Sequence, residues 1–221
     1  MINAPHNPTG MVPDRGTYDA LVAIAAEAGA HLLVDEVYRY LEFDEGDRLP
    51  AGVDAGSHVI SLGVMSKSFA MAGLRIGWLA SRDRDLLTRV AAFKDYTTIC
   101  ASAPAEILSL IGLRARNTVL ARSRELVTRN LAILDDFFAR RGDTFTWVRP
   151  RGGSIGFPRL RADLDADRFC AELVEAEGVL LLPGSRFAHP GNHVRIGFGR
   201  ADLPQALAGL ERHLARPRVP A

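Results

Sequence analysis

Short apolar runs alternate with amphipathic stretches along the first 80 residues of the chain. Helical spacing of apolar residues predicts a helix over 14–29, with Asp14 as its N-cap and Gly29 as its stop. Three continuous apolar runs predict strands that are buried on both faces, as in a parallel sheet. They cover residues 31–35, 58–62 and 75–80. The first ten residues are rich in Pro, Asn and Gly and predict a loop.

After residue 80 the pattern changes twice. It is helical from 83 to 140, with a break at 102–104, and it predicts one long amphipathic helix over 118–141. Beyond Gly142, shorter elements follow. We expect strands at 144–149, 154–157, 179–182 and 193–198, and helices at 165–177 and 202–215. The chain is therefore predicted to form an α/β domain with a mainly parallel sheet over 1–117, and a connecting helix with an α+β domain over 118–221.

Composition narrows the class of protein. The chain has 221 residues, 48% of them hydrophobic, and a formal net charge of +1, so no global field favours nucleic acid or an anionic membrane. The first residues have no basic segment followed by an apolar one, and no run of 18 apolar residues occurs in the sequence, so we expect neither secretion nor a membrane span. Two cysteines, Cys100 and Cys170, are too few for a disulfide framework, and neither has histidines at metal-ligand spacing. We expect a cytoplasmic protein with a small-molecule substrate, no metal, no nucleic acid and no membrane.

The lysines are unusually few. Nearly all basic residues are arginines, and the only lysines are Lys67 and Lys94. Lys67 follows the apolar run at 58–62, and Arg75 stands eight residues further along. A lysine in such a place can be desolvated enough to act as a neutral amine. A Ser-Lys-Ser sequence by itself is more often part of a surface hairpin. Whether Lys67 is a surface residue or a catalytic amine therefore depends on the motifs around it.

Three motifs occur in a fixed order around this lysine. They are the turn Asn7-Pro8-Thr9-Gly10, the strand end Asp35-Glu36-Val37-Tyr38, and Ser66-Lys67 with Gly73-Leu74-Arg75 behind it. Each alone is weak, because such turns and strand-end acids are common. Their succession resembles the class I/II aminotransferases, which are fold type I enzymes that use pyridoxal 5′-phosphate (PLP). Near the end, Val194-Arg195-Ile196-Gly197 resembles the arginine motif with which this family binds the substrate carboxylate.

The resemblance implies a PLP-transferase-like large domain and a set of catalytic roles. Lys67 would hold the cofactor as a Schiff base and then move a proton at the substrate Cα. Asp35 would keep the pyridine nitrogen of PLP protonated, so that the ring accepts electrons. Tyr38 and Asn7 would hydrogen-bond the phenolic oxygen of the cofactor.

The resemblance also implies residues that bind the two anionic groups. Ser66 and Arg75 would bind the cofactor phosphate. Arg195 would take the substrate α-carboxylate through its planar guanidinium. Val64 stands where the family commonly has a second hydroxyl residue, three positions before the lysine.

Family members carry a substantial part before the N-P-x-G turn, including a phosphate-binding helix start and an aromatic residue stacked on the ring. These features are not in this sequence, so we expect a truncated chain and an incomplete large domain. A gene fragment, a mis-assigned start and one piece of a split enzyme all stay open. At full length the family resemblance implies a homodimer.

The implied reaction is amino-group transfer between an α-amino acid and a 2-oxo acid. The stretches VMSKSFAMAGLRIGW and RPRGGSIGFPRL resemble a subgroup near the capreomycidine synthases, which act by elimination and cyclisation on the same cofactor. A PLP-dependent lyase or cyclase is therefore the alternative function, and a non-catalytic remnant is a third. The identity of the amino acid stays open.

Overall fold

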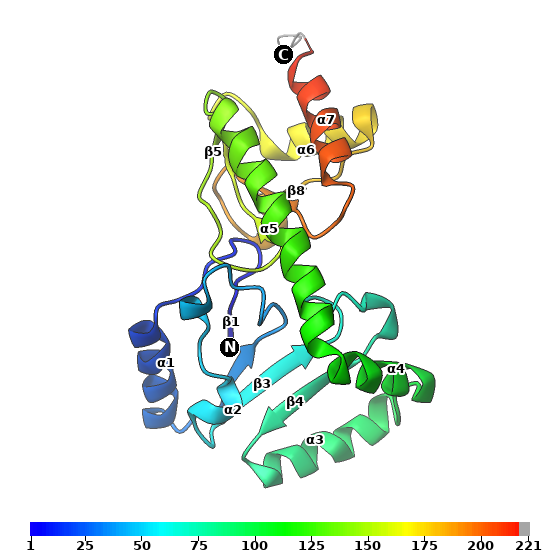
Figure 1. Cartoon of the computed structure of the whole chain (residues 1–221). Helices are drawn as coiled ribbons and strands as arrows, with labels where there is room; N and C mark the ends of the chain where they lie inside the picture. Colours follow the sequence, from blue (N-terminus) through cyan, green and yellow to red (C-terminus); the bar gives the residue numbers. More distant parts are fainter. Residues whose placement is uncertain (217–221) are drawn as a thin grey trace. The chain divides into compact units, whose positions relative to one another are not determined.

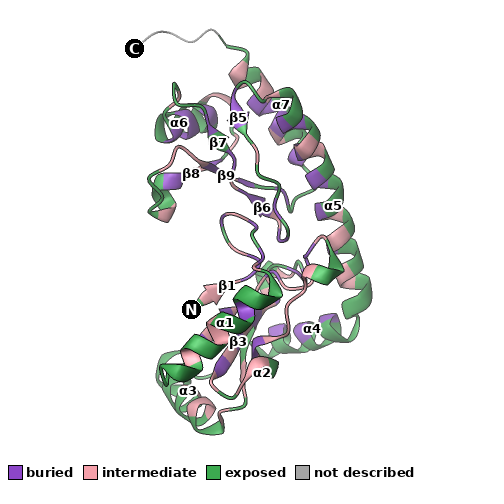
Figure 2. Cartoon of the chain, turned by 90° about the vertical axis from the view of Figure 1, so that its left-hand side faces the viewer, coloured by how far each residue is buried: buried purple, intermediate pink, exposed green. Residues whose placement is uncertain are grey.

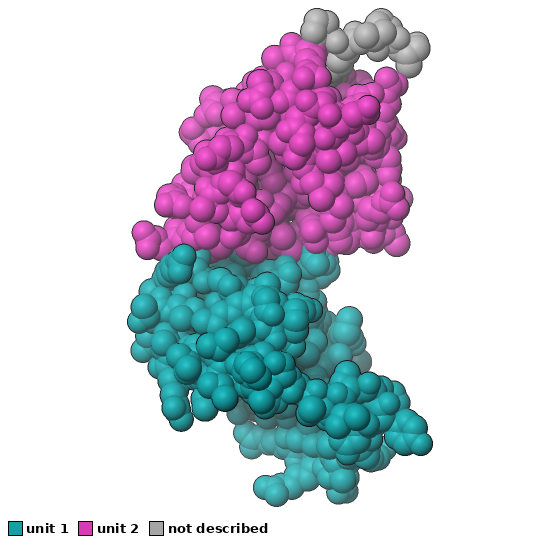
Figure 3. All heavy atoms as spheres, turned by 90° about the vertical axis from the view of Figure 1, so that its right-hand side faces the viewer, with its two compact units in different colours: residues 1–7, 11–124, 151–153 teal, residues 8–10, 125–150, 154–221 magenta. Residues whose placement is uncertain are grey.

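The computed structural model describes residues 1–216 and divides them into two compact units (Figure 3). Unit 1 comprises Met1–Asn7, Met11–Arg124 and Arg151–Gly153. Unit 2 comprises Pro8–Gly10, Glu125–Pro150 and 154–216. The assignment of domains to 1–117 and 118–221 stays a prediction, and its residues 217–221 lie outside the described part of the chain.

Unit 1 contains a four-stranded sheet in the order β1-β2-β3-β4 (Figure 1). Its strands are β1 (Ile2–Asn3), β2 (Leu32–Asp35), β3 (Val59–Val64) and β4 (Gly77–Ser81). The first three strands run parallel, and β4 pairs antiparallel to β3. The expected α/β class with a mainly parallel sheet is confirmed.

The prediction that the first ten residues form a loop is wrong at one point. Ile2–Asn3 is an edge strand, in which Asn3 pairs with Asp35 of β2. The backbone N–H of Ala4 donates to the Asp35 carbonyl at 3.1 Å and extends the pairing. Two residues are too few for a periodic apolar pattern, so this strand left no signal in the sequence.

Helices connect and flank these strands. In α1 (Arg15–Glu27), the Asp14 carboxylate accepts from the Thr17 N–H at 2.7 Å, and Gly29 follows the helix with a φ of +61°, as the sequence predicts. The remaining helices before residue 141 are η1 (Glu45–Asp47), α2 (Gly52–Ala55), η2 (Ala72–Leu74), α3 (Arg84–Thr97), α4 (Ala103–Arg114) and α5 (Arg116–Arg140). The chain passes from unit 1 to unit 2 within α5.

The core of unit 1 lies between α1 and the sheet. Tyr18, Leu32, Val34 and Val59 form a buried cluster there. By contrast, α3 and α4 are largely exposed (Figure 2), and they carry several large apolar side chains in contact with solvent. These are Phe93, Tyr96, Ile107, Leu108, Leu110, Ile111 and Leu113.

Unit 2 is built from short strands and two helices packed on the second half of α5. Its strands β6 (Ile155–Gly156), β9 (Val194–Gly197) and β8 (Leu182–Pro183) form an antiparallel sheet, and β5 (Phe145–Thr146) pairs with β7 (Arg159–Leu160). The helices are α6 (Ala166–Glu177) and α7 (Leu203–Leu214), and η3 (Gly184–Phe187) follows β8. Among the described residues, no helix has the length and apolarity to cross a membrane.

Aromatic stacking and one buried amide organise the interior of unit 2. The rings of Phe138 and Trp147 stack with centroids 4.4 Å apart, and the indole N–H of Trp147 donates to Asp135 at 2.8 Å. The Asn130 side chain of α5 is buried and donates to the carbonyls of Phe198 and Arg200 at 2.8 and 2.6 Å. It thereby ties α5 to the segment that follows β9.

One glycine of β3 allows a close approach to β4. Gly63 is paired with Trp78, and a Cβ added at Gly63 would lie 2.4 Å from the indole ring. On its other side, Trp78 contacts Phe69 edge to face at 6.4 Å between centroids. The indole therefore occupies the space that a side chain at position 63 would need.

We expect Gly63→Ala to lower the free energy of unfolding by about 1–3 kcal/mol, because the methyl group must displace the Trp78 ring. Urea unfolding followed by circular dichroism measures the change. Gly73→Ala is the matched control, since no heavy atom lies within 4 Å of a Cβ added there, and it should stay within about 0.5 kcal/mol of the parent. Equal effects of the two substitutions would contradict the packing described for Gly63.

Candidate functional site

An acidic side chain marks the carboxyl end of β2. The Asp35 carboxylate accepts a hydrogen bond from the Val37 N–H at 3.1 Å. The backbone N–H of Glu36, the residue directly after Asp35, donates to the Leu62 carbonyl of β3 at 2.9 Å. The carboxyl ends of the parallel strands β2 and β3 therefore meet at one edge, which is where open α/β sheets place their ligand sites.

Burial has a larger effect on the pKa of the Asp35 carboxyl than its hydrogen bond and the nearby positive charge have. Desolvation raises the pKa of Asp35, while the Val37 N–H and the positive charge of Lys67 act in the opposite direction and offset only part of the rise. Asp35 is thus a partly desolvated acid with a cation nearby. Such a carboxylate is stabilised by any further hydrogen-bond donor that enters the site.

Tyr38 and Lys67 lie close together in unit 1. The Tyr38 side chain is buried, and the Lys67 ammonium lies 5.7 Å from the centroid of its ring. Gly153 lies against the same ring: its φ is +85°, and a Cβ there would be 3.6 Å from Tyr38. Lys67 itself is exposed, so the residues of this chain do not provide the desolvation that we expected for its amine.

A serine next to the lysine holds the strand-end turn in place. The Ser68 hydroxyl is buried and donates to the carbonyls of Arg39 and Val37, at 2.5 and 3.2 Å. Lys67 and the turn that carries Tyr38 are therefore fixed to each other. This role of Ser68 could not be predicted, because a serine beside an exposed lysine has no burial signal in the sequence.

Arg75 and Ser66 approach each other across a strained loop. Arg75 has a φ of +55°, in the left-handed region that non-glycine residues seldom adopt, and Ala70 has the same value. One guanidinium nitrogen of Arg75 donates to the Ala72 carbonyl at 3.0 Å and lies 3.5 Å from the Ser66 hydroxyl. A cation beside a hydroxyl, both at the molecular surface, suits an anionic group.

Asn7 is linked to the same strand end through Asn3. The Asn7 backbone N–H donates to the Asn3 side-chain oxygen at 2.7 Å, and the Asn3 amide donates to the Asp35 carbonyl at 3.0 Å. Asn7 belongs to unit 1, whereas the rest of the turn, Pro8–Gly10, belongs to unit 2.

Arg195 lies in the other unit. It belongs to β9, is partly exposed, and has its guanidinium 5.4 Å from the centroid of the Phe187 ring. Unit 1 therefore holds six of the seven candidate residues, and unit 2 holds Arg195. The six are Asn7, Asp35, Tyr38, Ser66, Lys67 and Arg75. Within residues 1–216, no three His, Cys, Asp or Glu side chains are grouped as metal ligands.

Comparisons with known proteins identify the family of the chain. The family model described as aminotransferase class I and II matches residues 1–209. Among curated proteins, the chain is 31% identical to the aspartate aminotransferase of Thermotoga maritima and 28% identical to the capreomycidine synthase of Streptomyces vinaceus. Each match covers 97% of this chain and 55% of the relative, so the chain spans about half the length of these proteins.

A solved structure gives the same result for the fold. A PLP-dependent aminotransferase from Streptococcus suis superposes with a TM-score of 0.89 and 33% identity. The match covers 99% of this chain and 57% of that one.

The raised pKa of Asp35 predicts a pH-dependent gain in stability for Asp35→Asn. A carboxyl whose folded pKa is raised supports the fold fully below its unfolded pKa and loses that support as the pH rises through the folded value. Asparagine carries no charge and keeps an acceptor for the Val37 N–H. We therefore expect Asp35→Asn to raise the urea midpoint of the ligand-free chain at pH 7, and to raise it less at pH 4.

Asp95→Asn, at an exposed position of α3, is the control for this prediction and should change the midpoint little at either pH. A loss of stability at pH 7 in Asp35→Asn would show that hydrogen bonds of the ionised carboxylate outweigh its desolvation.

Proposed function

Because this chain belongs to the class I and II aminotransferase family, we propose that the whole protein is a PLP-dependent aminotransferase. It transfers an amino group between an α-amino acid and a 2-oxo acid. The observation that carries this proposal is the gathering of Asp35, Tyr38 and Lys67 around one strand end, where the charge of Lys67 acts on the Asp35 carboxyl.

The side chains present fit PLP by their chemistry. Asp35 is a carboxylate short of donors, which suits the protonated nitrogen of a pyridine ring. Arg75 and Ser66 offer a cation and a hydroxyl to a phosphate, and Lys67 offers an amine that is open to solvent. When bound, PLP supplies a conjugated ring that withdraws electrons from the substrate Cα.

The residues of unit 1 then have separate tasks. Lys67 would hold the cofactor through its amine and would carry a proton to or from the substrate Cα. Asp35 would keep the ring nitrogen protonated. Tyr38 and Asn7 would donate hydrogen bonds to the ring hydroxyl oxygen. Ser68 acts indirectly, since it fixes the turn of Tyr38 to the lysine segment.

Binding of the two anionic groups falls to arginines in different units. Arg75, with Ser66, binds the cofactor phosphate. Arg195 binds the substrate carboxylate with two parallel hydrogen bonds. We propose that residues 1–117 serve as the cofactor-binding part of the large domain and 118–221 as the connecting helix and small domain.

A PLP-dependent lyase or cyclase is the second candidate. The similarity to capreomycidine synthase over 216 residues favours it. Elimination and cyclisation begin with removal of the same Cα proton, so Lys67 and Asp35 would keep their tasks. A non-catalytic remnant is a weaker candidate, because a scaffold has no need for the six residues gathered in unit 1.

We further propose that the protein is a cytoplasmic homodimer. The exposed apolar side chains of α3 and α4 support an interface with a second copy. Cys100 and Cys170 are both free thiols, which suits a reducing compartment.

Borohydride reduction in the presence of PLP tests the proposed function. We expect the reduced cofactor to be attached to Lys67. The other lysine, Lys94, lies on α3, and its ammonium group donates a hydrogen bond to the Ile99 carbonyl at 3.0 Å. Peptide mapping by mass spectrometry locates the label. The matched variants are Lys67→Arg, which should abolish labelling, and Lys94→Arg, which should leave it unchanged. Label on Lys94 with Lys67 unmodified would refute the assignment.

Arg195→Lys should weaken the binding of α-amino acids by about 1.5–3 kcal/mol and leave PLP binding unchanged. Lysine keeps the charge but loses the planar fork that pairs with a carboxylate. Dissociation constants for an α-amino acid and for the matching amine without the carboxylate, measured on the PLP-bound whole protein, separate the possibilities. An equal loss for both ligands would give Arg195 a structural role instead.

A further inference from the structure

Tyr18 carries a buried hydroxyl inside the core of unit 1. Its side chain is 0% exposed, and its ring packs among Leu32, Val34 and Val59. In the described part of the chain, the hydroxyl has no hydrogen-bond partner. A buried hydroxyl without a partner loses its hydration and gains nothing in return, so natural proteins rarely leave one unpaired.

The Tyr18 side chain borders a small cavity with polar walls. Three other polar side chains line this cavity, namely Glu36, Arg39 and Glu42, and the rest of the wall is apolar. The cavity has room for about one water molecule. A buried water needs two to four polar partners, and the walls offer that number.

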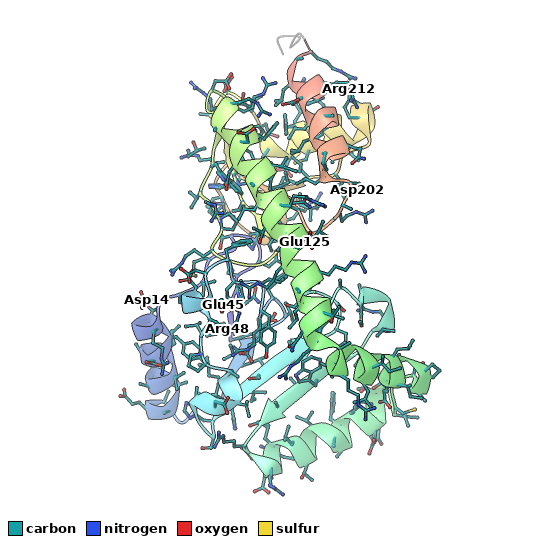
Figure 4. The ribbon with its side chains drawn as sticks, in the orientation of Figure 1. Asp14, Glu45, Arg48, Glu125, Asp202 and Arg212 are labelled. Atoms are coloured by element: carbon teal, nitrogen blue, oxygen red, sulfur yellow. The ribbon has the colours of Figure 1, made fainter. Side chains whose placement is uncertain are left out.

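The charges around the cavity cancel in pairs. Glu36 forms an ion pair with Arg39 at 3.1 Å. Glu42, only 4% exposed, pairs with Arg48 at 3.3 Å, and Arg48 also lies 3.7 Å from Glu45 (Figure 4). With both carboxylates already paired with arginines, a cation or an anion would gain little there. The cavity therefore suits a small neutral group that can both donate and accept.

We propose that this cavity is a binding site for one resident water molecule, which joins the Tyr18 hydroxyl to the Glu36–Arg39 pair. The phenol donates to the water, and the water donates to a carboxylate of the wall. Burial, and after it the charge of Glu36, raises the pKa of Tyr18, so the phenol keeps its proton at neutral pH. Helix α1 is thus linked to the residues that follow Asp35.

The link continues to the lysine segment. Glu36 also lies 3.4 Å from the Gly52 N–H, and the backbone carbonyl of Arg39 accepts from Ser68, the neighbour of Lys67. Tyr18 therefore acts as a positioning residue for the strand-end turn. This last step rests on the proposed function, whereas the water site does not.

Tyr18→Phe tests the water site, because the two possibilities predict changes of opposite sign. If a water pairs with the hydroxyl, its removal should lower the melting temperature of the chain by about 2–4 °C. If the hydroxyl is unpaired, its removal relieves a desolvation cost and the melting temperature should rise. Thr128→Val, which also removes one hydroxyl, is the control, since Thr128 is exposed on α5, and it should leave the melting temperature unchanged. A rise or no change in Tyr18→Phe would overturn the proposal.

A crystal structure at high resolution gives a second, independent measurement. We expect electron density for one water within about 3.2 Å of the Tyr18 hydroxyl oxygen. An empty cavity in such a map would overturn the proposal even if Tyr18→Phe were destabilising.

The positioning role has its own readout in the PLP-bound whole protein. Tyr18→Phe should shift the pH at which the visible absorption of the bound cofactor changes, and Thr128→Val should not. An unshifted titration would overturn the positioning role of Tyr18. The proposed function would be unaffected by that result, because it is decided by whether PLP attaches to Lys67.

Discussion

The pairing of β2 with β3 is the constraint on which the candidate site depends. Asp35 stands opposite Leu62 in a parallel register, and Lys67 follows β3 after a short turn. A shift by one residue would turn Asp35 to the other face of the sheet and bring Val34 or Glu36 opposite Leu62. The register is set in turn by burial, because Val34 and Val59 must both face the core under α1. The apolar core thus decides where the charged groups meet.

Several features of the candidate site lower the stability of the fold. Burial disfavours the ionised form of Asp35, and Tyr40, Ala70 and Arg75 all have positive φ values without being glycines. Residues in such conformations cost on the order of 1–3 kcal/mol each. They persist because neighbouring bonds determine the backbone, as the two bonds from Ser68 do for the turn after Asp35. Strain and desolvation gather around the same strand end, as is common for ligand sites.

Features that repeat along the sequence could be predicted, and single contacts could not. The runs that became β2 and β3 and the Asp14 cap follow from periodicity and capping rules. The candidate site residues came from motifs in a fixed order. In contrast, the antiparallel direction of β4 could not be predicted, because an apolar run does not indicate in which direction its strand pairs with a neighbour. The roles of Ser68 and Tyr18 depend on which backbone groups reach them, and an apolar pattern counts Tyr18 simply as core.

The two tryptophans of the chain lie in different units. Trp78 belongs to β4 of unit 1, beside Gly63, and Trp147 belongs to unit 2, stacked on Phe138. Each unit therefore contains one tryptophan in a distinct surrounding, one partly open to solvent and one held by an aromatic partner and an indole hydrogen bond. Replacing either tryptophan by phenylalanine leaves a single indole, which can be excited selectively over tyrosine. The emission of the chain can then be used to follow each unit separately as it unfolds.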